Sequence, residues 1–543
     1  MTRTISPKQH YDLIIIGGGI YGSVLLWEAI NRGYNAVLVE SGDFCSGTTA
    51  NTAKILHGGI RYLQSLNLRR IKESSHDRQH YCKLAPHLTS PLPSLMPTDR
   101  SLSRNRWIMG AGFYGYNLLL RIFAQGEVDP VFLKNGLISQ AEMIDRVRWL
   151  DPKRVTGAAQ WTDAQVNNAE RLGFSFVKTA MDAGADAFNY LRVKEILSKR
   201  GAVTGVVAVD QLSNKTVALS GDLVVTTTGH WSRHLLSPLC PSIPSTHHFQ
   251  RAVNLIVPLS LSSYALGLKV KKPSGPPERR LLFASPWQGQ TLFGTWYFKG
   301  LLPPAEDRGR VTDDEINHCL DEINLTFGNL ELTADDCSLI HVGHLPVDSK
   351  ERLMEKEEII DPHRHGGPTG LYAVQGVKYT TALSVAKKTF QLLEKRTLSQ
   401  RPITHRATTS LYGWESDQSD LDPISTLKEP IRAKLSPMTL ERLARNYGTV
   451  MKRIVEWDVR QPSLLEPLPG TDNTLCAEIP YLLENEAVYR LSDLLVRRMG
   501  LGGEGRPNTD TIAFCASQMS SYLGWTPDQE KREISSLIGH YNR

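Results

Sequence analysis

"DLIIIGGGIYGSVLLWEAINRGYNAVLVE", residues 12–40, carries the pattern that decides the fold of the N-terminal part of the chain. It starts with an apolar, mostly β-branched run at 13–16, which predicts a strand buried on both faces. Glycines follow with the spacing G-x-G-x-x-G, and apolar residues then recur at helical intervals until Gly33, a typical helix C-cap. A second apolar run at 36–39 ends in Glu40. This order predicts a Rossmann-type dinucleotide site.

Each residue of this motif has a mechanical role in such a site. Gly17 permits the tight turn, Gly19 lets the backbone approach a pyrophosphate, and Gly22 lets the helix pack closely on the strand. The helix N-terminus offers unpaired N–H groups and a partial positive charge to the pyrophosphate. Glu40 stands where an acid accepts the ribose hydroxyls, which disfavours the 2′-phosphate of NADP. The motif leaves NAD and FAD open.

The composition is that of an ordinary globular protein with several domains. The chain has 543 residues, 41% of them hydrophobic and 22% charged, with a net charge of +6. No basic helix with interleaved aromatics occurs, so we expect no nucleic-acid partner. The seven cysteines are scattered and contain no C-x-x-C, which indicates reduced thiols, no zinc or other metal site, and a cytoplasmic setting. No signal-peptide core and no run of about 18 apolar residues occurs, so we expect no membrane span.

One segment, "RNRWIMGAGFYGYNLLLRIF" at 104–123, gives two interpretations. It is too short and too rich in glycine to cross a bilayer. The first interpretation is a helix buried against the main domain. The second is a basic amphipathic helix on an anionic membrane surface, which makes the protein peripheral to the membrane.

Helical and strand signals divide the chain into three parts. Alternating helices and strands over the first 240 residues predict an α/β domain, and successive strands over 246–300 predict an antiparallel sheet. The predicted fold class is therefore α/β + α: a Rossmann-like dinucleotide-binding domain, an antiparallel sheet and a C-terminal all-α domain. The expected boundaries are 1–400 for the first domain (dinucleotide-binding parts at about 11–90, 150–240 and 366–398, antiparallel sheet at about 245–350), 401–430 for a linker, and 431–543 for the helical domain.

Further segments identify a resemblance that covers nearly the whole chain. They are "GTTANTAKILHGGIRYL" (47–63), "WTDAQVNNAERLGF", "GADAFNYLRV", "LVVTTTGHWS", "SPWQGQTLFGT", "GVKYTTALSVAKK" and "EIPYLLENEAVYRLSDLLVRRMGLG". In this order they resemble the flavin-dependent glycerol-3-phosphate dehydrogenases, members of the D-amino-acid-oxidase-like flavoprotein superfamily. The resemblance favours FAD over NAD as the cofactor. It implies that residues 1–400 form an FAD-dependent oxidoreductase domain, a Rossmann-like FAD-binding domain with an antiparallel-sheet substrate domain at about 245–350.

The resemblance also implies which residues bind the flavin. The glycine motif and Glu40 bind the ADP half of FAD. The strand–turn–helix after residue 375 closes over the isoalloxazine, where a helix N-terminus stabilises reduced flavin. The cofactor-binding residues implied in this way are Gly17, Gly19, Ile20, Gly22, Glu40, Thr48, Thr49, Asn51, Thr52, Val193, Gly229, Trp231, Gly376, Lys378, Tyr379 and Thr380.

For the substrate, the resemblance implies oxidation of an alcohol, with hydride transfer to flavin N5. It places the candidate catalytic residues His57, Arg61 and Lys378 beside the substrate, together with Tyr62 and Thr380. Arg61 and Lys378 suit an anionic substrate or a developing alkoxide, and His57 is a candidate acid/base, although a structural histidine is an equal alternative.

Three departures from the family pattern affect the substrate sheet. A G-x-R-P element, whose arginine binds the substrate phosphate in the family, reads Gly343, His344, Leu345, Pro346 here. Asn254 replaces a histidine, and the usual G-T-T-D has become Gly294, Thr295, Trp296, Tyr297. We therefore expect Asn254, Trp296, His344 and Leu345 to line the substrate site, with Arg251 as the nearest substitute cation for the missing arginine.

Three functions remain open at this stage. The first is oxidation of glycerol 3-phosphate or a related polyol. The second is oxidation of an amine, amino acid or other non-phosphate substrate, because Leu345 replaces the phosphate-binding arginine and the aromatic pair Trp296–Tyr297 suits a cationic or larger group. The third is a flavin-binding interaction protein without turnover. The sequence leaves the electron acceptor open between quinone and oxygen.

Overall fold

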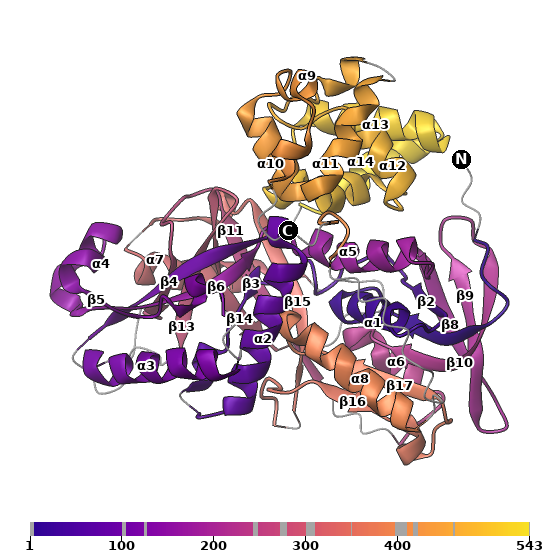
Figure 1. Cartoon of the computed structure of the whole chain (residues 1–543), viewed down its shortest axis with the longest axis horizontal. Helices are drawn as coiled ribbons and strands as arrows, with labels where there is room; N and C mark the ends of the chain where they lie inside the picture. The colour runs from indigo at the N-terminus through magenta and orange to yellow at the C-terminus, as the bar shows by residue number, and fades with distance from the viewer. Residues whose placement is uncertain are drawn as a thin grey trace.

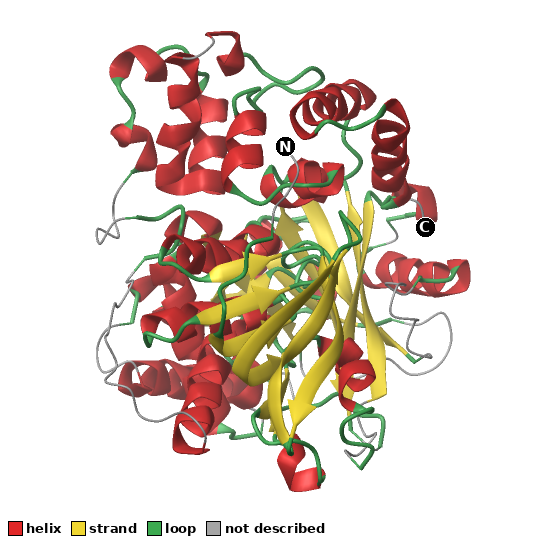
Figure 2. Cartoon of the chain, turned by 90° about the vertical axis from the view of Figure 1, so that its right-hand side faces the viewer, coloured by secondary structure: helices red, strands yellow, loops and turns green. Residues whose placement is uncertain are grey.

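The computed structural model describes residues 5–63, 65–99, 105–123, 128–242, 248–271, 280–299, 310–328, 330–348, 350–396, 410–415, 422–459 and 462–541. It contains two β-sheets side by side and a helical domain that packs above them in Figure 1. In Figure 2 the strands run through the centre with helices on both flanks. This arrangement confirms the predicted fold class.

The first sheet is the Rossmann-like part of the chain. Its order is β16-β17-β10-β1-β2-β7, and its central strands are parallel. Strands β8 and β9 extend β10 as an antiparallel ribbon. The strands are β1 (Tyr11–Ile16), β2 (Ala36–Val39), β7 (Asp186–Phe188), β8 (Leu191–Lys199), β9 (Ala202–Asp210), β10 (Thr216–Thr226), β16 (Glu358–Ile360) and β17 (Leu371–Gln375).

Helices cover one face of this sheet and the β8–β9 ribbon packs on the other. Helices α1 (Ile20–Asn31), α5 (Ala169–Asp182) and α8 (Ala382–Arg396) bury their apolar residues in one core with alternate residues of β1 and β2. The remaining residues of those strands form a second core with β8 and β9. Burial on both faces explains the continuous apolar runs in the sequence.

The glycine turn has the geometry that the sequence predicts. Gly17 has φ +103°, a conformation that L side chains rarely adopt. A Cβ on Gly22 would lie 1.9 Å from the carbonyl oxygen of Gly17, so helix and turn pack at backbone distance. Gly33, with φ +77°, follows the C-cap Arg32 of α1.

The second sheet contains the predicted antiparallel strands and others besides. Its order is β15-β11-β14-β13-β12-β4-β6-β3, with β5 on β6, and it is antiparallel except for the pair β12–β4. Helices α4 (Gln140–Arg146) and α7 (Asp313–Thr326) pack on one face. The strands are β3 (Ile55–Leu56), β4 (Thr89–Thr98), β5 (Gly136–Ser139), β6 (Gly157–Val166), β11 (His248–Val257), β12 (Ala265–Lys269), β13 (Leu281–Trp287), β14 (Gln290–Phe298) and β15 (Leu339–Val347).

The C-terminal part is all-helical with its own core. Its helices are α9 (Glu429–Arg432), α10 (Pro437–Tyr447), α11 (Met451–Val455), α12 (Glu478–Asn485), α13 (Thr509–Leu523) and α14 (Pro527–Gly539), and a π-helix spans Asp493–Arg498. Gly448, with φ +55°, separates α10 from α11, where the sequence pattern predicts one helical stretch. Half of the predicted linker over 401–430, namely 401–409 and 416–421, lies outside the described residues. Its part at 410–415 buries Leu411 and Tyr412 and is therefore packed.

Three α-helices remain. Helices α2 (Leu68–Leu84) and α3 (Arg106–Phe123) flank the second sheet, and the short α6 (Ser232–Leu236) follows β10. Helix α3 lies along the lower left edge of the molecule in Figure 1. None of the helices in the described part of the chain combines the length and the apolar character that a membrane crossing requires.

Candidate active site

A cavity of about 1020 Å³ lies between the two sheets and the helical domain. The N-terminal end of α1, the loop after β2, the ends of β10 and β17, strands β11, β14 and β15, and helix α14 all contribute to its wall. Every cofactor-binding residue expected from the sequence lines it except Gly22, whose contribution is the close packing of α1.

The glycine turn and α1 form one end of this wall. No side chain caps α1 at Gly19, and a Cβ there would meet only Thr49 Oγ1, at 3.2 Å. The N–H of Ile20 donates to Thr49 Oγ1 at 3.0 Å. Glu40 accepts the N–H groups of Gly18 and Gly42, both at 2.6 Å, so its carboxylate is fixed at the end of β2.

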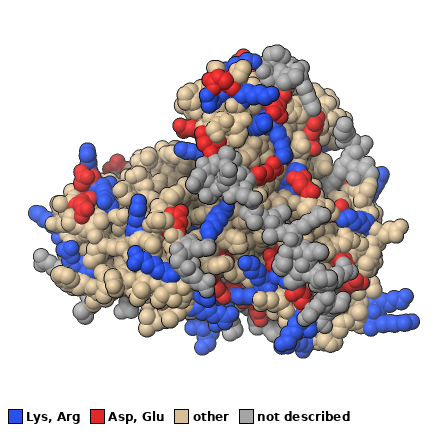
Figure 3. Space-filling view, in the orientation of Figure 1, with Lys and Arg blue, Asp and Glu red and all other residues tan. Residues whose placement is uncertain are grey.

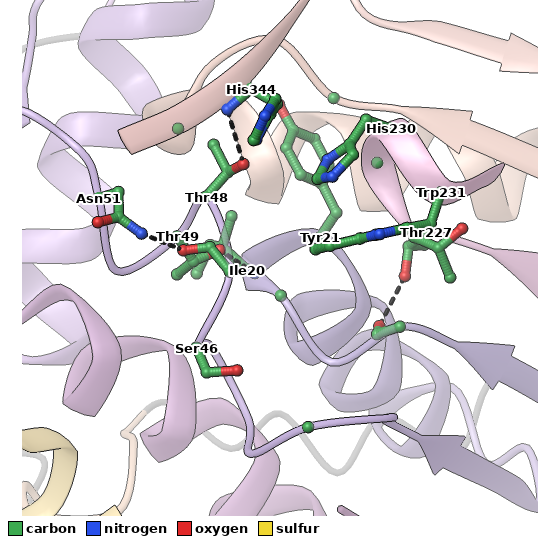
Figure 4. Close-up of a pocket in the computed structure, with 18 of the residues that line it drawn as sticks. Ile20, Tyr21, Ser46, Thr48, Thr49, Asn51, Thr227, His230, Trp231 and His344 are labelled. Carbon is green, nitrogen blue, oxygen red and sulfur yellow. Dashed lines mark hydrogen bonds between the residues drawn. The ribbon is translucent and has the colours of Figure 1, made fainter. Parts of the chain in front are cut away.

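The hydroxyl-rich loop after β2 connects the two sheets. Thr48 Oγ1 accepts the N–H of His344 at 3.1 Å, and Asn51 Oδ1 accepts the N–H of Val342 at 3.3 Å. Figure 4 shows Thr48 directly beneath His344. Thr52 accepts the N–H of Lys54 at 3.2 Å. The small polar side chains thus pin the loop to strand β15 along the cavity.

Aromatic rings line the cavity where β10 ends. His230 stacks on His344, with ring centroids 4.1 Å apart, and lies 3.7 Å from the Trp231 ring centroid (Figure 4). Burial, and then His344, lowers the pKa of His230 to about 3. Gly229 makes the preceding turn with φ +58°. Strand β8 contributes Val193 to the cavity wall, and a register shift follows Val193 in the ladder between β8 and β9.

Tyr21 holds the loop that starts at Gly376. Its hydroxyl donates to the carbonyl of Lys378 at 2.6 Å and accepts the N–H groups of Val377 and Lys378, both at 3.2 Å. A Cβ on Gly376 would lie 2.0 Å from the Tyr21 ring. Tyr379 lines the cavity, and its hydroxyl donates to the carbonyl of Ala169 at 2.9 Å. The loop conformation therefore depends on a tyrosine inside the glycine motif.

Three basic side chains surround the ring of Tyr62. Lys378 Nζ lies 4.5 Å from the ring centroid and the Arg61 guanidinium carbon 5.0 Å from it, while the His57 ring centroid is 6.1 Å away. Arg61 also donates to the Tyr62 hydroxyl at 3.1 Å. The structure thus brings together all three candidate catalytic residues. The buried Thr380 lines the cavity with them, whereas Tyr62 is buried and is not among the residues that line it.

Burial and mutual repulsion change the ionisation of this cluster. Burial, and then Arg61, lowers the pKa of Lys378 to about 7. Burial, and then Arg61 and Lys378, holds the pKa of His57 well below its usual range, so the imidazole is neutral at pH 7. Lys378 Nζ and His57 Nδ1 are buried and make no hydrogen bond to any described residue. Groups of this kind are typical of a ligand site.

Of the four residues expected from the departures, three line the cavity. Leu345 and His344 do so from β15, and Asn254 from β11. Asn254 is fully engaged in the protein, because it donates to the carbonyl of Asn51 at 3.3 Å and accepts the Thr295 hydroxyl at 2.7 Å. Tyr297, which is 42% exposed, reaches the cavity from β14.

Trp296 and Arg251 do not reach the cavity, contrary to the expectation from sequence. The Trp296 indole is buried against α7 and donates to Glu322 at 2.7 Å. Arg251 is held on Glu315 of α7 by two hydrogen bonds, at 2.6 and 2.9 Å. Side chains alternate between the faces of a strand, and these two belong to the face that α7 covers. We therefore exclude both from the site.

Some wall residues were not expected from the sequence. Tyr21 is one, since its contact with the loop at 376–378 joins positions more than 350 residues apart. His230 is another, and it stands beside the predicted Gly229 and Trp231. The helical domain also contributes wall residues, from the segment 489–498 and from α14.

The comparison with known families matches this geometry. A family model described as "FAD dependent oxidoreductase" matches residues 12–392. The chain belongs to this family. A second model, described as "C-terminal domain of alpha-glycerophosphate oxidase", matches residues 395–530 and begins before the predicted boundary at 431.

Relatives of this flavoprotein align over almost its whole length. A glycerol-3-phosphate dehydrogenase of Synechocystis is 26% identical, with 96% of this chain and 95% of the relative covered. An aerobic glycerol-3-phosphate dehydrogenase of Bacillus subtilis is also 26% identical, over 92% of this chain and 88% of the relative. The structure of glycerol-3-phosphate dehydrogenase from Bacillus halodurans, complexed with FAD, shares the fold with a TM-score of 0.75, 22% identity, and coverage of 98% and 95%.

The residues of this chain fit FAD as the cofactor. The glycine turn leaves room for a pyrophosphate at Gly19, and Glu40 is fixed at the end of β2. The buried nitrogens Trp231 Nε1 and His230 Nε2, like those of His57 and Lys378, line the cavity without a hydrogen-bond partner among the described residues. The bound flavin supplies the acceptor for a hydride.

Proposed function

We propose that this flavoprotein oxidises the alcohol group of glycerol 3-phosphate or a closely related polyol substrate. The observation that carries the proposal is the basic cluster of Lys378, Arg61 and His57 around Tyr62, inside the cavity that the glycine motif lines. Relatives named glycerol-3-phosphate dehydrogenase cover the chain nearly end to end, which supports the same chemistry.

In this proposal Lys378 and Arg61 hold the anionic part of the substrate or its developing alkoxide. Burial, and then the nearby Arg61, lowers the pKa of Lys378, and an anion bound between the two side chains favours the protonated form of Lys378. A preorganised donor in a site shielded from water stabilises negative charge far better than water does. Arg61 lies at the exposed side of the cavity and Lys378 deeper inside.

His57 is the proposed base that accepts the hydroxyl proton while the carbon gives up its hydride. Its ring is neutral at pH 7 for the reasons given above, and a neutral imidazole has a free lone pair. The buried Nδ1 makes no hydrogen bond to a described residue, so that nitrogen is not committed to a structural role. This favours the acid/base role over the structural one.

The phosphate end of the site is unusual. Leu345 lines the cavity together with Pro346, Leu353 and Met354, so this part of the wall is largely apolar. Arg251 does not substitute for the missing arginine, because Glu315 holds it on the other face of the sheet. Loss of one guanidinium–phosphate contact, at about 3 kcal/mol, corresponds to roughly a hundredfold in affinity.

We therefore expect glycerol 3-phosphate to reduce the flavin only at high concentration, and Leu345→Arg to improve its apparent affinity by roughly tenfold to a hundredfold. The measurement is anaerobic flavin bleaching as a function of substrate concentration. Leu345→Met is the matched control, since it changes shape without adding charge. Complete bleaching of the unmutated protein at micromolar substrate, with no gain in Leu345→Arg, contradicts this view of the pocket.

Oxidation of an amine or amino acid loses its main support. The expectation depended on Trp296 and Tyr297 acting as an aromatic pair, and only Tyr297 reaches the cavity. Glycine oxidase of Bacillus cereus shares the fold with a TM-score of 0.51 at 17% identity. This likeness concerns the fold and does not indicate the substrate.

We also propose that α3 binds to an anionic membrane surface. Its buried face, with Tyr116 and Leu120, packs on Ile71 of α2. Its other face exposes large apolar side chains, and so do the turn before α2 and the first residue of α2. They are Trp107 (79% exposed), Tyr114 (77%), Ile122 (58%), Ile108 (57%) and Leu118 (50%), with Leu66 (75%) and Leu68 (47%).

The charges around this apolar face favour a lipid surface. Helix α3 contains no Asp or Glu, and Arg106 and Arg121 near its ends are exposed, as are Arg69 and Lys72 of α2. In Figure 3 the lower left edge, where α3 lies in Figure 1, shows mainly tan and blue atoms. Exposed aromatic side chains bordered by cations are typical of helices that lie in the lipid headgroup region.

We expect the protein to sediment with vesicles containing anionic lipid and the variant Trp107→Glu to lose about tenfold in binding. Met438→Glu is the matched control, because Met438 is 61% exposed but belongs to the helical domain. Equal loss in both variants, or no binding of the unmutated protein at low salt, contradicts the proposal.

A further inference from the structure

The C-terminal helical domain forms part of the cavity wall next to Glu40. Two groups of residues contribute: one just before and within the π-helix, the other on α14. They are Arg490, Ser492 and Arg497, and Glu533, Ser536 and Leu537. This wall belongs to a domain that the family model for the flavin-binding part, ending at residue 392, does not include.

A continuous chain of contacts leads from Glu40 to this domain. The N–H of Leu191 donates to the Glu40 carbonyl at 2.8 Å, and the N–H of Tyr190 donates to the Gly42 carbonyl at 2.9 Å. The Arg490 guanidinium carbon lies 5.5 Å from the centroid of the Tyr190 ring, and Arg490 donates to Glu533 of α14 at 2.6 Å. Because an acid in the position of Glu40 binds the ribose next to the adenine, this end of the cavity takes the adenosine half of the dinucleotide.

A buried ionic cluster fixes the loop after Glu40 to the same domain. Asp43 accepts two hydrogen bonds from Arg498, both at 2.9 Å, and one from Arg497 at 2.5 Å. All three side chains are almost completely buried. Burial alone would raise the pKa of Asp43, but the guanidinium groups of Arg498 and Arg497 hold it below its usual range. The loop that carries Glu40 therefore has its position set by the helical domain.

We infer that the C-terminal helical domain completes the adenosine subsite of the FAD site, so that cofactor binding and docking of this domain stabilise each other. Any group that binds only the docked form shifts the equilibrium toward it, and the effect is reciprocal. The inference goes beyond the proposed oxidation and holds whichever substrate is oxidised.

Two neighbouring serines of α14 give a matched pair of variants. Ser536 lines the cavity, whereas Ser535 is exposed outside it. Neither side chain hydrogen-bonds to another residue in the part of the chain that the structure describes, so a tryptophan at either position tests only whether the space is free. We expect Ser536→Trp to raise the dissociation constant of FAD by about tenfold or more and Ser535→Trp to leave it unchanged, as measured by quenching of flavin fluorescence on the apoprotein.

The second measurement uses the unmutated full chain. Amide hydrogen exchange with and without FAD should show slower exchange in α14 and over residues 486–498 when FAD is bound. Unchanged exchange in both segments, or FAD binding by Ser536→Trp as tight as that of Ser535→Trp, overturns the inference. Neither measurement involves substrate, so a failure here is distinct from a failure of the proposed oxidation.

Discussion

Lys378→Met is expected to leave the protein yellow and to slow anaerobic reduction of the flavin by glycerol 3-phosphate by about 10²-fold or more. The Nζ of Lys378 is buried beside Tyr62 with no hydrogen-bond partner among the described residues, so its removal breaks no bond that the fold needs. Methionine preserves the length of the side chain and its contact with the ring. What is lost is a preorganised cation facing the substrate.

Lys356→Met is the control for this variant, because Lys356 is exposed and lies outside the cavity. The two variants should retain the same amount of FAD and differ only in the rate of reduction. Equal rates in both remove Lys378 from the mechanism.

The pH dependence of substrate binding gives a second readout of the same residue. With a pKa of about 7, Lys378 loses its proton as the pH rises through neutrality. The ammonium form, which attracts an anion, prevails below that pKa. Affinity for glycerol 3-phosphate should therefore fall as the pH rises through about 7, and this step should be absent in Lys378→Met.

Gly19→Val is expected to give a folded but colourless protein. A Cβ at this position meets only the side-chain atom Thr49 Oγ1, at 3.2 Å, and a small shift of that side chain relieves the tight contact, so the fold tolerates the change. The valine side chain nevertheless occupies the place where the pyrophosphate approaches the backbone. We expect FAD affinity to fall by more than about a hundredfold, measured by the flavin retained after gel filtration.

Variants at two other glycines serve as comparisons for Gly19→Val. Gly22→Ala places a Cβ 1.9 Å from a carbonyl oxygen and should cost both the flavin and part of the thermal stability. Gly115→Ala in α3 meets nothing within 4 Å and should change neither. A yellow Gly19→Val protein with full FAD content contradicts the assignment of the glycine motif to the cofactor.

The parts of the site that the sequence predicts are those that depend on local geometry. The strand, the glycine turn, α1 and Glu40 occupy fewer than thirty consecutive residues, and each position has a steric reason that is visible in the sequence. The family segments located the loop at 47–63 and the turn at 376–381, and the structure brings both to the same cavity.

The parts that the sequence did not predict depend on strand register and on distant contacts. Trp296 and Tyr297 are adjacent on β14, so only one of the two side chains can face the cavity. The register of β14 against β11, which shifts between Val253 and Asn254, determines which one does. Arg251, the cation proposed from its sequence position to replace the missing arginine, lies on the face of the sheet opposite the cavity, where it binds Glu315. No local pattern indicates that Tyr21 holds Lys378 or that Arg490 faces Tyr190.

Anaerobic addition of candidate substrates to the purified protein, with the visible flavin spectrum recorded, tests both the cofactor and the proposed oxidation. We expect one FAD per chain, with little affinity for NAD, and bleaching by glycerol 3-phosphate at high concentration but not by glycine or proline. Bleaching by an amino acid while glycerol 3-phosphate and related polyols leave the spectrum unchanged would contradict the proposed oxidation.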